Sequence, residues 1–230
     1  MFVAGGVDSP ITEGIIKGYT MIRALTQSWN DQPERASRPF SADRDGFVLA
    51  EGSWMFVLEE YEHAKARGAR IYAEITGYGA TCEAFHRVRM SDSPEEPARA
   101  ISVALDESQL SPEDIQYVSL HGTSTEMNDR VETQAIKLAL GDQAPRIPMS
   151  AVKSQLGHAQ GACGSASVAA TIIAMEHGTI PPTINLDQPD PCCDLDYVTD
   201  LGRKAEIENA ICNCVGFGSK NSALVLRKVS

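Results

Sequence analysis

Two short stretches of the chain place a histidine, a glycine and other polar residues directly after an apolar run. In the first, residues 117–120 lead into His121-Gly122-Thr123-Ser124-Thr125, and in the second, residues 147–152 lead into Lys153-Ser154-Gln155-Leu156-Gly157-His158. The carboxyl ends of parallel strands meet at one edge of an open α/β sheet, where ligands bind. We therefore expect both imidazoles and the lysine ammonium to share one site that polarises a carbonyl group.

Each stretch taken alone has a simpler interpretation. His121 by itself fits a surface histidine in a capped turn, and Lys153 with His158 fits a surface lysine and a helix-capping histidine. Phe217 stands between Gly216 and Gly218 and fits either a mobile aromatic gate or a core phenylalanine in a tight turn. Spacing alone favours the simpler interpretation in each case, and only the combination of two strand-end histidines indicates a site.

The six cysteines, at positions 82, 163, 192, 193, 212 and 214, are dispersed along the chain. Their spacing fits neither a zinc module nor a small disulfide scaffold, so we expect free thiols in a reducing cytoplasm and no metal site. Cys163 is placed at the start of a predicted helix, where a thiol can become a nucleophile. Its neighbours are small and apolar, which favours a buried thiol selected for its size.

Composition excludes several partners. The net charge of -11 argues against nucleic acid and anionic membranes, because both favour a basic surface. The most apolar run, residues 161–175, is too short and too rich in serine and threonine to span a bilayer, so it predicts a buried helix of small residues.

The periodicity of apolar residues predicts the elements that position these side chains. We expect helices over residues 11–25, 59–67, 95–109, 128–140 and 161–177, and strands over 47–52, 53–58, 71–78, 115–120, 147–152, 210–214 and 222–228. From residue 71 the order is β-α-β-α-β-α-β-β, which predicts a mostly parallel sheet with helices on both faces. The first six residues resemble a strand that enters a glycine turn, so we expect the chain to begin inside a larger fold.

Several motifs in the same order resemble one enzyme family. They are Arg38-Pro39-Phe40, residues 43–48, residues 58–64, His121-Gly122-Thr123-Ser124-Thr125, Lys153-Ser154 with Gly157-His158, residues 181–185 and Gly216-Phe217-Gly218. The chain resembles the C-terminal half, and part of the N-terminal half, of the elongating β-ketoacyl-acyl-carrier-protein synthases. This resemblance implies an α/β thiolase-like fold with a five-stranded mixed sheet between helices. Residues 1–70 would be the tail of the N-terminal half and residues 71–230 the C-terminal half.

The resemblance also implies a reaction, the decarboxylative Claisen condensation of an acyl thioester with malonyl-carrier protein in fatty-acid or polyketide synthesis. His121 and His158 would hold the malonyl thioester carbonyl, and Lys153 would organise the site electrostatically. Phe217 would be the gate, and Thr123 and Thr125 would contact the phosphopantetheine arm. The implied partners are acyl carrier protein and a second ketosynthase subunit, in a homodimer or a heterodimer, with no cofactor beyond the carrier's phosphopantetheine.

The chain departs from the family pattern at several positions. The family's nucleophilic cysteine belongs to a motif that none of the six cysteines occupies. Ser167 stands where a glutamate is usual, and Asn128 and Trp54 stand where small residues are usual. The loop Gly218-Ser219-Lys220-Asn221 is bulkier than the usual glycine-rich one. We therefore expect the isolated chain to be an incomplete acyltransferase that forms no acyl-enzyme. A non-condensing or chain-length partner subunit and an inactive truncation remain the alternatives.

Overall fold

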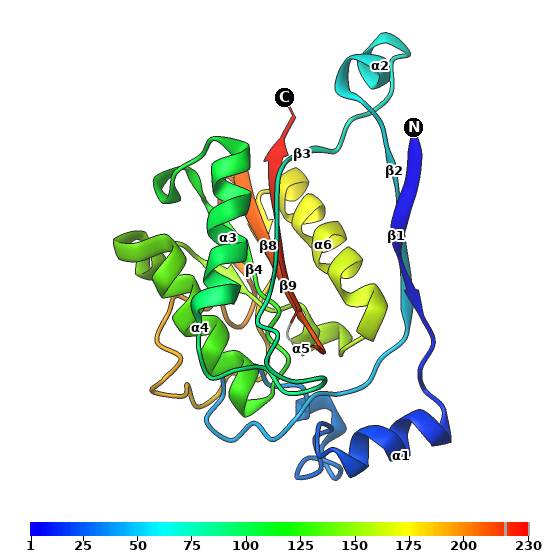
Figure 1. The fold of residues 1–230 in the computed structure, drawn as a ribbon, viewed down its shortest axis with the longest axis vertical. Helices are drawn as coiled ribbons and strands as arrows, with labels where there is room; N and C mark the ends of the chain where they lie inside the picture. The colour runs from blue at the N-terminus through cyan, green and yellow to red at the C-terminus, as the bar shows by residue number, and fades with distance from the viewer. Residues whose placement is uncertain (219, 230) are drawn as a thin grey trace.

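A five-stranded sheet forms the centre of the fold in a computed structural model that describes residues 1–218 and 220–229 (Figure 1). Its order is β3 (Ala73–Cys82), β9 (Lys220–Lys228), β8 (Asn209–Gly216), β4 (Tyr117–Ser119) and β5 (Met149–Ser150). Strand β4 pairs parallel with β5 and β8, whereas β9 pairs antiparallel with both β8 and β3. Within this sheet β9 therefore runs against the other four strands, which gives the mixed sheet that the resemblance implied.

Helices cover both faces of the sheet, as the alternation of elements predicted. Helices α3 (Glu95–Ser108) and α4 (Glu126–Leu140) lie on one side, and α6 (Cys163–His177) lies on the other (Figure 1). Helix α3 approaches β3 so closely that a Cβ on Gly79 would lie 1.9 Å from the Ala100 carbonyl oxygen. Only glycine permits this contact between the helix and the strand backbone.

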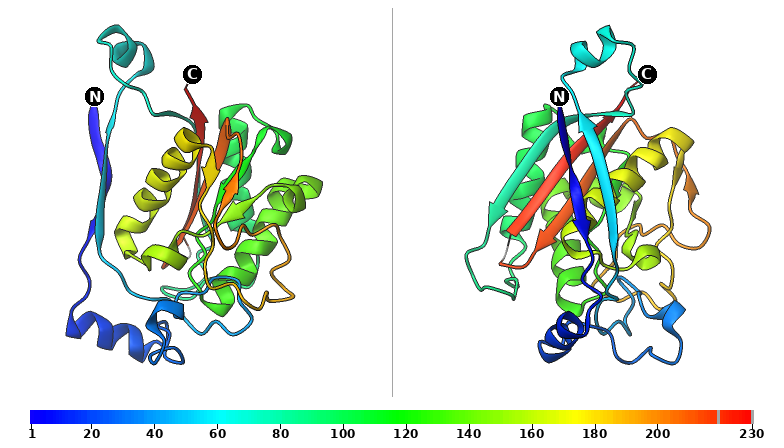
Figure 2. Two further views of the ribbon diagram at one scale, coloured as in Figure 1. Left: turned by 180° about the vertical axis from the view of Figure 1, so that it is seen from behind. Right: turned by 90° about the vertical axis from the view of Figure 1, so that its right-hand side faces the viewer.

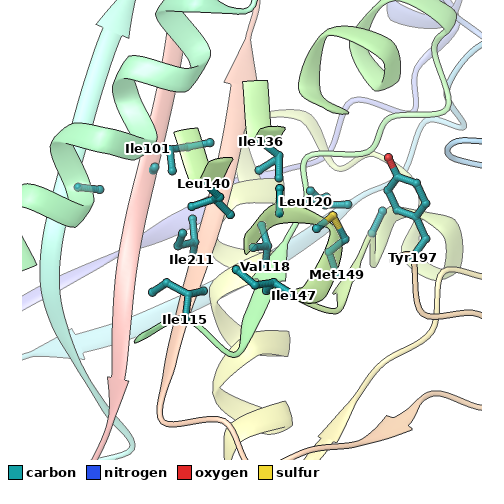
Figure 3. Close-up of a cluster of buried hydrophobic side chains, with 14 of the residues drawn as sticks. Ile101, Ile115, Val118, Leu120, Ile136, Leu140, Ile147, Met149, Tyr197 and Ile211 are labelled. Atoms are coloured by element: carbon teal, nitrogen blue, oxygen red, sulfur yellow. The ribbon is translucent and has the colours of Figure 1, made fainter. Parts of the chain in front are cut away.

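The main hydrophobic core lies between the sheet and the pair α3 and α4 (Figure 3). Its members are apolar residues at helical spacing on the helices and side chains on the facing strands, all nearly inaccessible to solvent: Ile101, Ile115, Val118, Leu120, Ile136, Leu140, Ile147, Met149 and Ile211. Burial of this apolar surface drives the two helices onto the sheet. The carboxyl ends of β4 and β5 are thereby fixed side by side.

A separate antiparallel pair, β1 (Phe2–Asp8) and β2 (Gly52–Leu58), lies beyond α6 (Figure 2). Helix α6 therefore lies between two sheets. Small residues on both sides permit this close packing. A Cβ on Gly6 of β1 would lie 2.6 Å from the carbonyl oxygen of Gly161, just before the helix. The prediction of a buried helix of small residues is confirmed, although its first turn, Gln160–Ala162, is a 3-10 helix.

The remaining elements are short. They are helices α1 (Glu13–Met21), α2 (Tyr61–Ala66) and α5 (Lys153–Leu156), strands β6 (Thr179–Ile180) and β7 (Arg203–Lys204), and 3-10 turns at Pro33–Arg35, Pro112–Asp114 and Gly141–Arg146. Among the described residues, no helix has the length and apolar character needed to cross a membrane.

Three predicted elements were wrong in detail. Residues 47–51 form no strand, because the Val48 carbonyl accepts the amide of His158 and Phe47 bridges only Leu25, whereas Gly52 begins β2. The strand predicted over 147–152 contains only residues 149–150, since helix α5 begins at Lys153. The helix predicted over 128–140 begins two residues earlier, at Glu126, with Thr125 as its N-cap residue. The Asn128 amide donates to the carboxylates of Asp129 and Glu132.

Candidate active site

A cavity of about 510 Å³ opens beyond the carboxyl ends of β4 and β5. His121 follows β4 and His158 follows α5, and both line this cavity. Their ring centroids lie 5.5 Å apart with the ring planes at 89°. The structure therefore brings together the two imidazoles that the sequence placed 37 positions apart. The cavity wall also holds Thr123, Thr125, Asn128, Cys163, Cys214 and Phe217.

A buried carboxylate holds the turn that carries His121. Glu132 of α4 accepts the backbone N–H of His121 at 2.6 Å and that of Gly122 at 2.8 Å. It also accepts the side-chain amide of Asn213 at 2.6 Å. Burial raises the pKa of Glu132, and these hydrogen bonds to its ionised form oppose the rise. No sequence pattern singled out Glu132, although it stands 11 residues after His121 on the helix that follows the turn.

A second buried carboxylate fixes the next residue of the turn. Asp129 accepts the backbone N–H of Thr123 at 3.1 Å and that of Phe40 at 2.9 Å. It also forms an ion pair with the Arg44 guanidinium at 3.3 Å, and both side chains are shielded from solvent. The two early motifs around Phe40 and Arg44 therefore help to hold the His121 turn, which explains their place in the pattern.

Lys153 sets the orientation of His121. Its ammonium donates to the His121 carbonyl oxygen at 2.6 Å and lies 3.3 Å from the His121 Nδ1 atom. An ammonium group has no lone pair to offer, so Nδ1 accepts and the imidazole proton resides on Nε2. This tautomer is assigned from the hydrogen-bond partners.

His158 has the same tautomer for a different reason. Its Nδ1 accepts the backbone N–H of Gln160 at 3.1 Å, which leaves the proton on Nε2. The backbone of His158 is itself fixed, since its N–H donates to the Val48 carbonyl at 2.7 Å and its carbonyl accepts the Ala50 N–H at 3.0 Å. Both imidazoles therefore keep an Nε2–H group that their Nδ1 partners do not use.

Burial keeps both imidazoles neutral. Desolvation lowers the pKa of His121 well below its ordinary value, and the nearby charges of Lys153 and His158 lower it further. Desolvation also lowers the pKa of His158, although a hydrogen bond with Cys163 opposes this. Two neutral N–H donors beside a cationic lysine suit an oxygen atom on which negative charge develops.

The other predicted site residues also reach the cavity. The hydroxyls of Thr123 and Thr125 lie 2.8 Å apart on its wall. Phe217 is 46% exposed and stacks on Tyr19 of α1 with ring centroids 6.1 Å apart, so it is not a core residue. The buried Ser167 accepts the Thr171 hydroxyl through its own carbonyl oxygen, within α6. The departure predicted at Ser219 lies outside the described residues.

Sequence reasoning missed one feature of the cavity, a pair of thiols. Cys163, the first residue of α6, and Cys214 of β8 have sulfur atoms that lie within 4.8 Å of each other and of a ring nitrogen of His121. Three such groups can in principle hold a metal ion. The spacing of the cysteines in the sequence could not reveal this, because the three residues come from three separate elements.

Comparison with known proteins identifies related chains. The model of the β-ketoacyl synthase C-terminal domain matches residues 72–187, and that of the N-terminal domain matches residues 1–64. The actinorhodin polyketide putative β-ketoacyl synthase 1 of Streptomyces coelicolor is 51% identical over 97% of this chain and 48% of its own length. The 3-oxoacyl-[acyl-carrier-protein] synthase 2 of Rhizobium meliloti is 45% identical over 99% of this chain and 54% of its own length. The chain thus spans about half the length of these relatives.

Solved structures give the same result for the fold. A ketosynthase of a type II polyketide synthase, in complex with its acyl-carrier protein, superimposes with a TM-score of 0.96 at 39% identity, over 99% of this chain and 56% of that one. The ishigamide ketosynthase/chain length factor gives a TM-score of 0.90 at 38% identity, over 99% of this chain and 54% of that one. The fold is therefore the thiolase-like α/β fold of the ketosynthases.

Proposed function

The chain belongs to the β-ketoacyl synthase family, and from that premise we propose that its cavity binds a malonyl thioester and releases carbon dioxide from it. The observation that carries this proposal is the pair of neutral imidazoles that face one cavity with their protons on Nε2. A thioester carbonyl oxygen placed between them would accept two hydrogen bonds.

The proposed reaction uses the two donors when charge moves. When the C–C bond to the malonyl carboxylate breaks, carbon dioxide leaves. The electron pair of that bond stays on the α-carbon and is delocalised into the thioester carbonyl as an enolate. Negative charge grows on the oxygen, so both hydrogen bonds strengthen in the transition state. The enolate carbon can then attack an acyl thioester, forming a C–C bond and expelling the thiol that carried the acyl group. Lys153 acts as a positioning residue that holds the His121 tautomer.

Acyl carrier protein is the proposed partner, and polyketide or fatty-acid synthesis is the proposed setting. The names of the relatives support both settings, and one structural neighbour is a complex with an acyl-carrier protein. Thr123 and Thr125 line the cavity with two hydroxyls, which can bond the amides of a phosphopantetheine arm. The acyl-bearing thiol of the complete condensation is, by the sequence-based expectation, supplied from outside the chain.

We test the proposal by measuring the release of labelled carbon dioxide from malonyl-acyl carrier protein over a range of pH. Because the pKa values of both histidines are lowered below 6.5, we expect the rate per folded molecule to stay level as the pH falls from 8 past 6.5. The unfolded chain binds these protons near pH 6.5 while the folded chain resists them, so thermal stability should decline below that pH. A rate that halves near pH 6.5, or no release above the spontaneous rate, would contradict the proposal.

A second candidate function, as a partner subunit of a ketosynthase dimer, rests on the outer face of β1 and β2. Val3, Val7, Met55 and Val57 point away from α6 and are each more than half exposed. Val3 lies opposite Val57 in the register, so the four form a continuous apolar strip. Strips of this kind mark sites of association.

We expect Val57→Lys to reduce association of the purified chain, as measured by light scattering over a range of concentrations. Lysine on this strip would have to lose its hydration in any interface. The control is Leu138→Lys on α4, which changes another exposed apolar residue. A strictly monomeric protein, or equal effects of the two substitutions, would argue against an interface on β1 and β2.

A further inference from the structure

We propose that Tyr19 of helix α1 is a positioning residue for His158, because its hydroxyl group holds the turn whose backbone N–H sets the tautomer of that imidazole. The tyrosine acts through Gln160, which lines the cavity. The consequence for the reaction rate rests on the proposed function, whereas the consequence for the tautomer does not. In the sequence this tyrosine served only as one of the apolar residues at helical spacing in residues 11–25.

Tyr19 is the contact through which α1 meets the cavity. The helix lies at one end of the molecule, apart from the five-stranded sheet (Figure 1). Of its nine residues, only Tyr19 is not exposed to solvent. A helix that buries so little of its surface gains little stability from packing, so the contacts of this one side chain determine where α1 lies.

The ring of Tyr19 contacts two aromatic residues of the cavity wall. It stacks on Phe217 with the ring centroids 6.1 Å apart, and it meets Phe47 edge to face at 5.3 Å. Phe47 in turn contacts the ring of His158 edge to face at 5.0 Å. Aromatic pairs have preferred geometries of this kind. The contacts hold the ring of Tyr19, so its hydroxyl group has a defined direction.

The hydroxyl group of Tyr19 holds the side chain of Gln160. It donates a hydrogen bond to the Oε1 atom of Gln160 at 3.0 Å, across 141 positions of the sequence. The other polar atom of that side chain, Nε2, is buried and has no hydrogen-bond partner among the described residues. Removal of the tyrosine hydroxyl would therefore leave both ends of the amide without a partner from this part of the chain.

The backbone of Gln160 needs this support. Its φ angle is +44°, in the left-handed region that residues other than glycine rarely adopt. In this conformation its N–H donates to Nδ1 of His158 at 3.1 Å, and its carbonyl accepts the N–H of Cys163 at the start of α6. A strained conformation persists only where the surrounding structure holds it. Without the bond from Tyr19, we expect the turn to relax and the N–H to move away from His158.

The tautomer of His158 depends on that one backbone donor. While the Gln160 N–H points at Nδ1, the imidazole proton stays on Nε2. When the donor moves away, Nδ1 can carry the proton, and Nε2 then presents a lone pair where the proposed oxyanion needs a donor. Only the fraction of molecules with the productive tautomer changes. The turnover rate should therefore fall, while the binding of substrate should not.

The tautomer is measured by nitrogen NMR on the chain with isotope-labelled histidines, because protonated and unprotonated ring nitrogens give separate signals. In the wild-type protein we expect His158, identified by its loss in His158→Ala, to show the Nε2–H form alone. Tyr19→Phe keeps the ring and removes only the hydroxyl, so the Nδ1–H form should appear beside it. The matched control is Tyr78→Phe, which removes the hydroxyl of an exposed tyrosine on β3. Identical His158 signals in wild type and folded Tyr19→Phe would overturn the proposal, as would a change of equal size in Tyr78→Phe.

A second variant tests the route through Gln160. Gln160→Met keeps the length of the side chain and removes its acceptor, so it should change the His158 signals as Tyr19→Phe does. The double variant should change them no further, because both substitutions break the same bond. Additive effects of the two substitutions would overturn the route.

The rate of carbon dioxide release separates this proposal from the proposed function. In Tyr19→Phe we expect kcat to fall about tenfold, because one neutral hydrogen bond is lost, and KM to stay within about twofold of wild type. An unchanged kcat in a variant whose wild-type parent releases carbon dioxide would overturn the positioning role. The expected tautomer change in a protein that releases no carbon dioxide would overturn only the proposed malonyl function.

Discussion

Replacing either His121 or His158 by alanine should lower the rate of carbon dioxide release from malonyl-acyl carrier protein by about 10²–10³-fold. Each substitution removes one of the two Nε2–H donors that the cavity offers to a developing oxyanion. His121 is only 4% exposed, and a fixed donor of this kind stabilises an oxyanion better than a mobile water molecule does. The measurement is the initial rate of labelled carbon dioxide release at saturating substrate.

The chain provides matched controls for this comparison. His177 is an exposed histidine at the end of α6, and His177→Ala should keep the wild-type rate. Circular dichroism and a thermal melt show whether each variant is folded. Rates within a few-fold of wild type in folded His121→Ala and His158→Ala would refute the assignment of the two imidazoles as the oxyanion donors.

The largest loss of stability is expected from Glu132→Ala. The substitution leaves three buried donors without an acceptor, the backbone N–H groups of His121 and Gly122 and the side-chain amide of Asn213. Each unsatisfied buried donor costs about 1–3 kcal/mol, so a loss of about 3–9 kcal/mol in the free energy of unfolding is expected. Urea unfolding followed by circular dichroism measures this loss directly.

Two further variants show whether the loss of stability comes from the Glu132 carboxylate itself. Gln134 is exposed on the same helix, so Gln134→Ala should leave the urea midpoint within experimental error of wild type. Glu132→Gln should also be destabilising, because its amide presents donors where two backbone donors already point. Equal midpoints for Glu132→Ala and wild type would show that the His121 turn does not depend on this carboxylate.

The spacing of apolar residues predicted the helices α3, α4 and α6 and the strands that meet at the site. Burial of one face of an element imposes this spacing on its sequence, so the pattern can be recognised without the fold. The direction of β9 was not predictable from alternation, since it depends on the short connection between β8 and β9. The absence of a strand at residues 47–51 was also unpredictable. The Val48 carbonyl and the Ala50 amide pair with His158, more than 100 positions later.

The sequence by itself determined which side chains could polarise a carbonyl, because the two stretches that carry His121, Lys153 and His158 each follow an apolar run that sheet topology places at one edge. Only the tertiary structure decided how they act. The contacts of Lys153 with His121 and of Gln160 with His158 select the Nε2–H tautomers, and burial keeps the rings neutral. The tertiary structure also revealed the pair of thiols, because Cys163 of α6 and Cys214 of β8 are distant in the chain and their sulfur atoms lie within 4.8 Å of each other only in the fold.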